Sequence, residues 1–159
     1  MGVSGCGKTT VGSLLAAALG WRFLDADDFH PPASIAKMAA GAPLTDGDRA
    51  PWLAGLNRRL GECVNRGEPV VLACSALKES YRTRLARGIG GLRFVFLKGD
   101  LATIRARMLS RSGHYMKAGL LESQFAALEE PADAIVADIA AAPDAIVGRI
   151  YAAIASTAG

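Results

Sequence analysis

Short apolar runs alternate along the chain with longer segments in which apolar residues recur at helical spacing. This alternation is typical of βαβ units, in which helices cover a parallel sheet. Strands are expected at four runs, of which Phe94-Val95-Phe96-Leu97 is the clearest: 22–25, 69–74, 92–98 and 134–138. Helices are expected at 8–19, 34–40, 49–66, 78–87, 101–110, 120–128 and 144–156. Asp48 is placed to cap the third helix, with Pro51 early in its first turn.

The composition predicts one globular domain over residues 1–159. Hydrophobic residues make up 51% of the chain and charged residues 21%, and no repeat, linker or low-complexity tail interrupts them. The net charge is only +3 and basic residues are interspersed with acidic ones, which argues against a nucleic-acid partner. No apolar run reaches the ~18 residues that cross a membrane, so no membrane partner is expected. Three cysteines without metal-ligand spacing indicate reduced thiols in a cytoplasmic protein.

The first residues carry the most informative motif of the chain. Gly2-Val3-Ser4-Gly5-Cys6-Gly7-Lys8-Thr9 matches G-x-x-x-x-G-K-[ST], the phosphate-binding P-loop, and an apolar helix follows as that motif requires. Glycines let backbone N–H groups converge on an anion, and the helix N-terminus adds to the attraction. Lys8 is expected to reach the outer phosphates of ATP, and the Thr9 hydroxyl to bind Mg²⁺. Thr10 and the whole motif are the expected nucleotide ligands; the alternative is a glycine-rich turn that binds nothing.

A P-loop normally follows a buried strand, and here only Met1 precedes it. The first strand of the parallel sheet is therefore expected to be missing from this chain. Either the protein begins upstream of an internal methionine, which we favour, or the sheet is completed in another way, since central parallel strands carry much of the core.

Three carboxylates follow the first expected strand, where open α/β sheets bind their ligands. They are Asp25, Asp27 and Asp28, and if the strand continues through them, Asp25 and Asp27 point to the same side. One carboxylate beside a P-loop could hold metal-bound water, and a second could accept the proton of an attacking hydroxyl. The alternative is an acidic loop that caps the next helix. A Walker-B aspartate is absent, because the run 70–74 leads into Ser75, which favours small kinases whose metal carboxylate lies on another strand, as Asp25 would.

Arginines at two places are candidates for binding anions. Arg49 begins a helix, where a cation is unfavourable against the helix dipole, and a guanidinium fixed there could clamp a carboxylate in two-pronged fashion. Arg107 and Arg111 are one helical turn apart, so they repel each other unless an anion lies between them. A basic lid over 107–120 could close on the phosphates and expel water. The alternative for Arg107 and Arg111 is a solvated helix face.

Other polar residues at the expected strand ends are candidates for binding a substrate. His30 follows the acidic cluster, and Ser75, Lys78 and Arg82 follow the second strand. These side chains could contact a polyol or a second anion. His114 is a lone histidine within the lid segment, and such a residue is often structural or incidental.

The chain as a whole resembles the bacterial gluconokinases, which are P-loop kinases of the nucleoside-monophosphate-kinase type. The resemblance covers nearly the whole sequence, and its more specific parts are the His-Pro segment, Cys-Ser-Ala-Leu-Lys and the Gly-His segment of the lid. The matching segments are 1–9, 23–31, 37–53, 74–78 with Tyr81-Arg82, 96–100, 111–115 and 124–131. The inserted acid Asp28 departs from the family pattern, since an apolar residue is expected there, and this leaves open whether Asp27 or Asp28 faces the substrate.

The resemblance implies a three-layer P-loop fold and ATP-dependent phosphorylation of D-gluconate to 6-phosphogluconate, with substrate-binding helices at about 30–66. It implies ATP and Mg²⁺ as cofactors, and a homodimer, since relatives are commonly dimers. The implied catalytic residues are Lys8, Asp27 and Arg111, with Thr9 and Asp25 at the metal and Arg107 on the nucleotide. Arg49 would meet the gluconate carboxylate; the implied substrate set is Asp27, His30, Arg49, Ser75, Lys78, Arg82 and His114. The alternatives are a kinase of another small hydroxy acid, such as shikimate, or a nucleotide-binding module without turnover.

Overall fold

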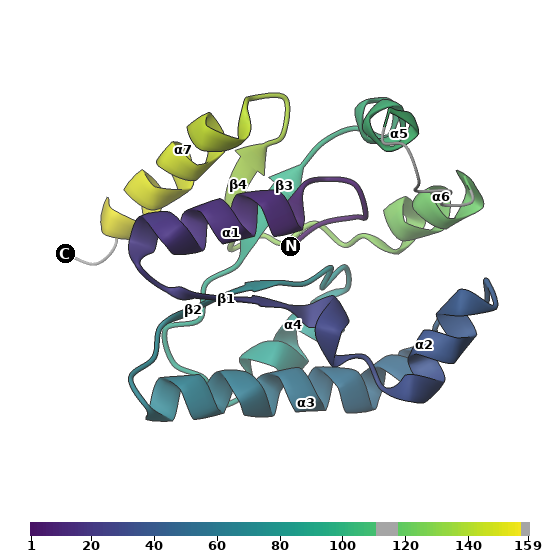
Figure 1. Cartoon of the computed structure of the whole chain (residues 1–159), viewed down its shortest axis with the longest axis horizontal. Helices are drawn as coiled ribbons and strands as arrows, with labels where there is room; N and C mark the ends of the chain where they lie inside the picture. The colour runs from purple at the N-terminus through teal and green to yellow at the C-terminus, as the bar shows by residue number, and fades with distance from the viewer. Residues whose placement is uncertain (111–117, 157–159) are drawn as a thin grey trace.

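The computed structural model describes residues 1–110 and 118–156, and within them helices and strands alternate as expected (Figure 1). The strands are β1 (Arg22–Asp25), β2 (Val70–Ala73), β3 (Val95–Lys98) and β4 (Ile135–Asp138). The helices are α1 (Lys8–Leu19), α2 (Pro32–Ala39), α3 (Asp46–Asn65), α4 (Glu79–Ala86), α5 (Leu101–Leu109), α6 (Ala118–Ala127) and α7 (Pro143–Ser156), with a 3₁₀ turn η1 (Ala26–Phe29) after β1. None of the helices in these described ranges is long and apolar enough to span a membrane.

The strands of the described residues form two parallel pairs and no continuous sheet. β1 pairs with β2, with Arg22 opposite Val70, and β3 pairs with β4, with Val95 opposite Ile135. Met1 and Gly2 connect the two pairs: Leu97 N–H donates to Met1 O (3.0 Å), and Gly2 N–H donates to Ser75 O (3.2 Å). The P-loop therefore starts between β2 and β3, where the expected central strand would end.

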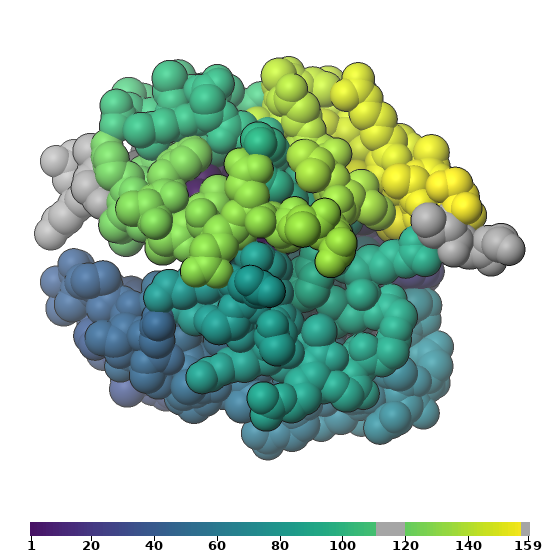
Figure 2. Space-filling model, turned by 180° about the vertical axis from the view of Figure 1, so that it is seen from behind, coloured from purple at the N-terminus to yellow at the C-terminus, as the bar shows by residue number. Residues whose placement is uncertain are grey.

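Helices cover both sides of these strands. α1 packs against α7 and against β1 and β2, whereas α3 packs against α4 on the opposite side (Figure 1). From behind, α6, β4 and α7 form one half of the surface and α2, α3 and α4 the other (Figure 2). Each half has its own buried cluster: the first includes Val11, Leu15, Leu97, Ile104, Ile139 and Ile150, and the second includes Trp52, Leu53, Leu56, Tyr81 and Leu85.

The start of α3 differs from the expectation. Thr45 is the capping residue, and it forms a reciprocal capping box with Asp48: the Asp48 N–H donates to the Thr45 hydroxyl (3.2 Å), and the Thr45 N–H donates to the Asp48 carboxylate (2.7 Å). The prediction that Asp48 is the N-cap is therefore wrong, because Asp48 occupies the third helical position. Pro51 consequently lies beyond the first turn.

Candidate active site

The P-loop is held in a conformation that needs its glycines. Gly5 and Gly7 have φ angles of 81° and 98°, in the left-handed region that other residues avoid. A Cβ atom on Gly5 would lie 2.6 Å from Met108 Cγ, so the loop packs closely against α5. Gly7 is the N-cap of α1, which has no capping side chain and no acidic residue in its first turn. The N–H groups at that helix end are therefore available to an anion.

Two side chains fold over this loop. Lys8 Nζ donates to Val3 O at 3.0 Å, which keeps the ammonium group at the loop. Gln124, on α6, forms two hydrogen bonds with Ser4: Ser4 N–H donates to Gln124 Oε1 (2.7 Å), and Gln124 Nε2 donates to Ser4 Oγ (3.0 Å). Sequence reasoning did not assign Gln124 to the site, because nothing local in the sequence connects it with a loop 120 residues away.

The acidic turn after β1 lies next to the P-loop. The Thr9 hydroxyl donates to Asp25 Oδ2 at 2.8 Å, so the two residues predicted to bind metal lie side by side. Asp25 Oδ1 also accepts from the Asp27 N–H (3.1 Å), and this contact starts the 3₁₀ turn. β1 therefore ends at Asp25, and alternation along a strand does not orient Asp27, whose side chain is 83% exposed.

Trp52 binds the backbone of the acidic turn, and His30 stacks on Trp52. Their rings stack with centroids 4.3 Å apart and planes 12° apart, and the Trp52 indole N–H donates to Ala26 O (2.9 Å). His30 Nε2 lies 3.8 Å from Asp27 Oδ1. Burial lowers the pKa of His30 below its usual 6.5, although Asp27 opposes this, so burial favours the neutral imidazole. Trp52 thus fixes the backbone of the turn that carries Asp27.

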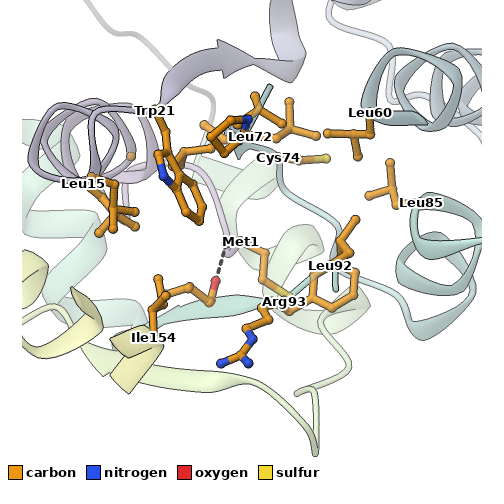
Figure 3. Close-up of a pocket in the computed structure, with 18 of the residues that line it drawn as sticks. Met1, Leu15, Trp21, Leu60, Leu72, Cys74, Leu85, Leu92, Arg93 and Ile154 are labelled. Carbon is orange, nitrogen blue, oxygen red and sulfur yellow. Dashed lines mark hydrogen bonds between the residues drawn. The ribbon is translucent and has the colours of Figure 1, made fainter. Parts of the chain in front are cut away.

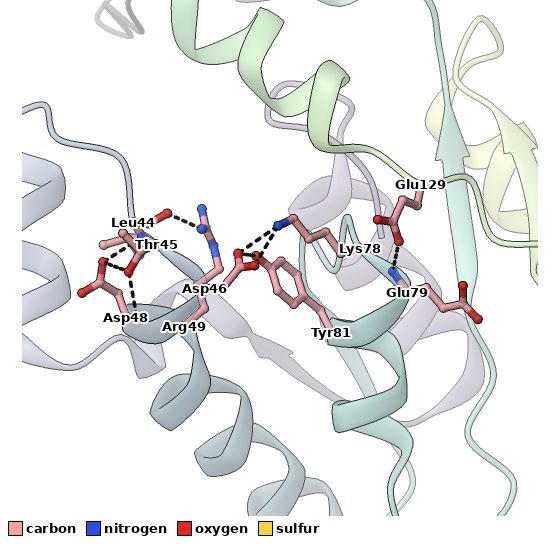
Figure 4. Close-up of polar contacts among 9 residues, drawn as sticks. All are labelled: Leu44, Thr45, Asp46, Asp48, Arg49, Lys78, Glu79, Tyr81 and Glu129. Carbon is pink, nitrogen blue, oxygen red and sulfur yellow. Dashed lines mark hydrogen bonds and ion pairs between the residues drawn. The ribbon is translucent and has the colours of Figure 1, made fainter.

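A second polar cluster joins the start of α3 to α4 (Figure 4). The Asp46 carboxylate accepts from Lys78 Nζ (2.9 Å) and from the Tyr81 hydroxyl, and the hydrogen bond from Lys78 lowers its pKa below 3.8. Arg49 Cζ lies 5.8 Å from the centre of the Tyr81 ring, within cation–π range, and its guanidinium donates to Leu44 O. Arg49 and Lys78, both predicted substrate contacts, are therefore brought together around Tyr81, and sequence reasoning had given Asp46 and Tyr81 no place in the site.

Other predicted residues lie in different surroundings. Arg82 is buried, and its guanidinium donates to Ala76 O and Leu77 O, both at 3.1 Å, so it holds the loop after β2 and its predicted contact with a substrate has no support in this placement. Ser75 is half-buried in that loop, and Arg107 donates to Ile139 O. Thr10 is exposed on the first turn of α1. Arg111 and His114, with most of the predicted lid, lie outside the described residues.

Comparisons with known proteins agree with this arrangement. The profile of the AAA domain family matches residues 1–133. The gluconokinase of Gluconobacter oxydans (strain 621H) is 50% identical over 133 residues, covering 84% of this chain and 75% of that protein. The thermosensitive gluconokinase of Escherichia coli (strain K12) is 49% identical over 131 residues, covering 82% of this chain and 70% of that protein.

This chain belongs to the gluconokinase family. A solved structure agrees with that assignment: the crystal structure of a gluconokinase from Sinorhizobium meliloti 1021 superposes with a TM-score of 0.90 at 45% identity, covering 99% of this chain and 90% of that one. The resemblance read from the sequence is confirmed, and so is the P-loop kinase fold.

Proposed function

We propose that this gluconokinase-family chain transfers the terminal phosphoryl group of ATP to the primary hydroxyl of D-gluconate. The observation that carries the proposal is the 2.8 Å contact between Thr9 and Asp25, because it joins a phosphate-binding loop to the acidic turn of Asp27. Family membership at about half identity supports the choice of gluconate as the acceptor.

Each group of residues has a separate task in this proposal. The P-loop amides and Lys8 hold the phosphates and offset the charge that spreads over the transferred group. Asp27 accepts the proton of the gluconate hydroxyl. The oxygen of that hydroxyl bonds to the terminal phosphorus of ATP, and the bond between this phosphorus and ADP breaks. Arg49 holds the gluconate carboxylate at the other end of the substrate, and Lys78 lies against the same Tyr81 ring as Arg49. Arg107 and Arg111 are proposed to act from the lid.

The donor atoms at Thr9 and Asp25 fit Mg²⁺. A hydroxyl oxygen and a carboxylate oxygen 2.8 Å apart are hard ligands, and Mg²⁺ is commonly bound by one or two carboxylates together with water and substrate phosphates. When bound, the ion would supply positive charge beside the phosphates. The oxygens of Thr9 and Asp25 would then hold and orient the ion.

The proposal also includes the location and the partners of the protein. A cytoplasmic location is supported by Cys6, Cys63 and Cys74, which are free thiols and all buried. A homodimer is proposed on the resemblance alone, and the acceptor is a small molecule.

A panel of acceptors tests the proposed function. With ATP and Mg²⁺, the chain is expected to release ADP in proportion to added D-gluconate and to form 6-phosphogluconate. Shikimate and a nucleoside monophosphate serve as the comparison, and they should give release no greater than that without an acceptor. Equal release with shikimate would favour a kinase of another hydroxy acid. ATP binding with no product from any acceptor would contradict turnover and favour a nucleotide-binding module.

Arg49→Ala is expected to raise KM for gluconate by about 10- to 100-fold, because a charge-assisted, two-pronged hydrogen bond is worth about 1.5–3 kcal/mol. KM for ATP should stay within about twofold. Arg59→Ala is the matched control, since Arg59 lies on the same helix and pairs with Glu62 at 3.1 Å. Steady-state kinetics with each substrate varied in turn gives the result, and an unchanged KM for gluconate would remove Arg49 from the acceptor site.

A further inference from the structure

One short segment contacts both parts of the proposed active site. Gln124, on α6, forms two hydrogen bonds with Ser4 in the P-loop. Five positions later, Glu129 accepts a hydrogen bond of 2.6 Å from the first N–H of α4, next to Lys78 (Figure 4). Residues 124–129, which we call the brace, therefore reach both the loop proposed to bind ATP and a residue proposed to bind gluconate.

The brace is anchored by apolar side chains. Leu121 and Phe125 lie one helical turn apart on α6, and Leu128 directly follows that helix. All three pack in the same hydrophobic cluster as Val3 of the P-loop and Leu77 of the loop before α4. The same core therefore fixes the backbone of the brace and of both loops.

The amide of Gln124 matches both polar groups of Ser4. The Ser4 N–H can only donate, so it faces Gln124 Oε1 (2.7 Å), and the amide nitrogen Nε2 consequently donates to Ser4 Oγ (3.0 Å). Gly5, the next residue, has the left-handed φ of 81° that turns the loop. Gln124 therefore holds the loop where it turns, and a loop held in its binding shape loses less entropy when it binds a ligand.

The surroundings of the P-loop increase the importance of these hydrogen bonds. Met1, which precedes the loop, and Lys8 within it both line a cavity of about 480 Å³ between the two strand pairs (Figure 3). A cavity supplies no packing contacts to the atoms that line it. Contacts from α6 consequently contribute more to the shape of the loop.

Glu129 is bonded on both sides of Lys78. Its N–H donates to Leu77 O at 2.9 Å, and its carboxylate accepts from the Glu79 N–H. Lys78 is the N-cap of α4 and forms no side-chain cap hydrogen bond, so Glu129 supplies an acceptor that this helix end needs. The backbone of Lys78 is thereby fixed, and its Nζ lies 2.9 Å from Asp46 Oδ2 in the cluster at the proposed acceptor site.

We propose that Gln124 and Glu129 are positioning residues for the two substrates: Gln124 holds the P-loop for ATP, and Glu129 holds Lys78 for the acid acceptor. Neither side chain touches a reacting atom, and each acts through the residue that it fixes. The role of Glu129 rests on the proposed function, whereas the role of Gln124 needs only the P-loop. Two substitutions five positions apart in one segment should therefore affect different substrates.

Gln124→Met keeps the length of the side chain and removes both hydrogen bonds to Ser4. We expect this variant to raise KM for ATP about tenfold and to leave KM for gluconate within about twofold, because the lost bonds lie at the P-loop. Steady-state kinetics with each substrate varied in turn gives both values. If Gln124→Met lowers Tm by more than about 5 °C, Gln124→Ala gives the same comparison with a strong helix former.

Glu129→Ala is the reciprocal test. It removes the acceptor at the start of α4 and is expected to raise KM for gluconate about fivefold, while KM for ATP stays within about twofold. Glu129→Gln keeps an acceptor oxygen for the Glu79 N–H and should recover most of the loss. Glu130→Ala is the matched control with both KM values within about twofold, since Glu130 is the next residue and pairs with Lys98 on the surface at 2.8 Å.

The pattern across the two variants decides the result. Parallel changes of both KM values in either variant, or a lower Tm with neither KM changed, would indicate a structural role only and overturn the proposal. An unchanged KM for ATP in Gln124→Met, or for gluconate in Glu129→Ala, would overturn the corresponding assignment. A parent protein without gluconate-dependent ADP release would instead contradict the proposed function, and Kd values for ATP and gluconate from calorimetry would then decide the two assignments in place of KM.

Discussion

Replacing Lys8 with alanine is expected to lower kcat by about 10³-fold while leaving the fold intact. Lys8 lies on the first turn of α1 and contributes one hydrogen bond to the structure, from Nζ to Val3 O. Removing the Lys8 side chain is therefore expected to change the free energy of unfolding little. In the reaction, however, the ammonium group is proposed to neutralise charge that grows on the transferred phosphoryl group.

Lys98→Ala is the control that separates loss of the Lys8 side chain from loss of any surface lysine. Lys98 ends β3 and pairs with Glu130 at 2.8 Å on the surface, where a single ion pair is worth about 0–1 kcal/mol. Both variants should unfold within a few degrees of the parent protein, by circular dichroism, and only Lys8→Ala should lose gluconate-dependent ADP release. A Lys8→Ala protein that keeps its kcat would exclude the proposed role of Lys8 and, with it, the P-loop as the reaction centre.

The sequence predicted the P-loop and its neighbours because their spacing is local and their topology is simple. G-x-x-x-x-G-K-[ST] determines which residues form the loop, and parallel strands bring their carboxyl ends to one edge, so Thr9 and Asp25 meet as expected. The helix and strand positions followed from periodicity and differ mainly at their ends. The break between β2 and β3 was expected because a P-loop requires a preceding strand.

Other parts of the site depend on contacts between distant segments, which periodicity does not reveal. The Ser4–Gln124 hydrogen bonds and the cluster of Asp46 with Lys78 and Tyr81 join residues separated by 120, 32 and 35 positions. Arg82 shows the same limit: a guanidinium after a strand end can bind an anion or backbone carbonyls, and the structure shows it buried and donating to Ala76 O, so its predicted contact with a substrate stays a prediction. The Thr45 cap, in contrast, was readable from the Thr-x-x-Asp pattern.

Substitutions in the acidic turn can distinguish Asp27 from Asp28, between which the sequence alone does not decide. Asp27 and Asp28 are adjacent, both exposed, and both in the 3₁₀ turn. The surroundings favour Asp27, because its N–H is bonded to Asp25 and its carboxylate lies 3.8 Å from His30 Nε2. His30 in turn is fixed by stacking on Trp52, so the turn that carries Asp27 rests on two stacked rings.

Asp27→Asn is therefore expected to lower kcat by about 10²- to 10⁴-fold, the usual effect of losing a general base, and Asp28→Asn by less than about threefold. The amide of asparagine matches the carboxylate in size, and each variant removes one negative charge from the same turn, so a general electrostatic effect on nucleotide binding would appear in both. Steady-state kinetics with saturating ATP, together with the Kd for ATP of each variant, separates the two cases. Loss of kcat in Asp28→Asn but not in Asp27→Asn would assign the base to Asp28, and near-normal kcat in both would show that the hydroxyl proton leaves by another route.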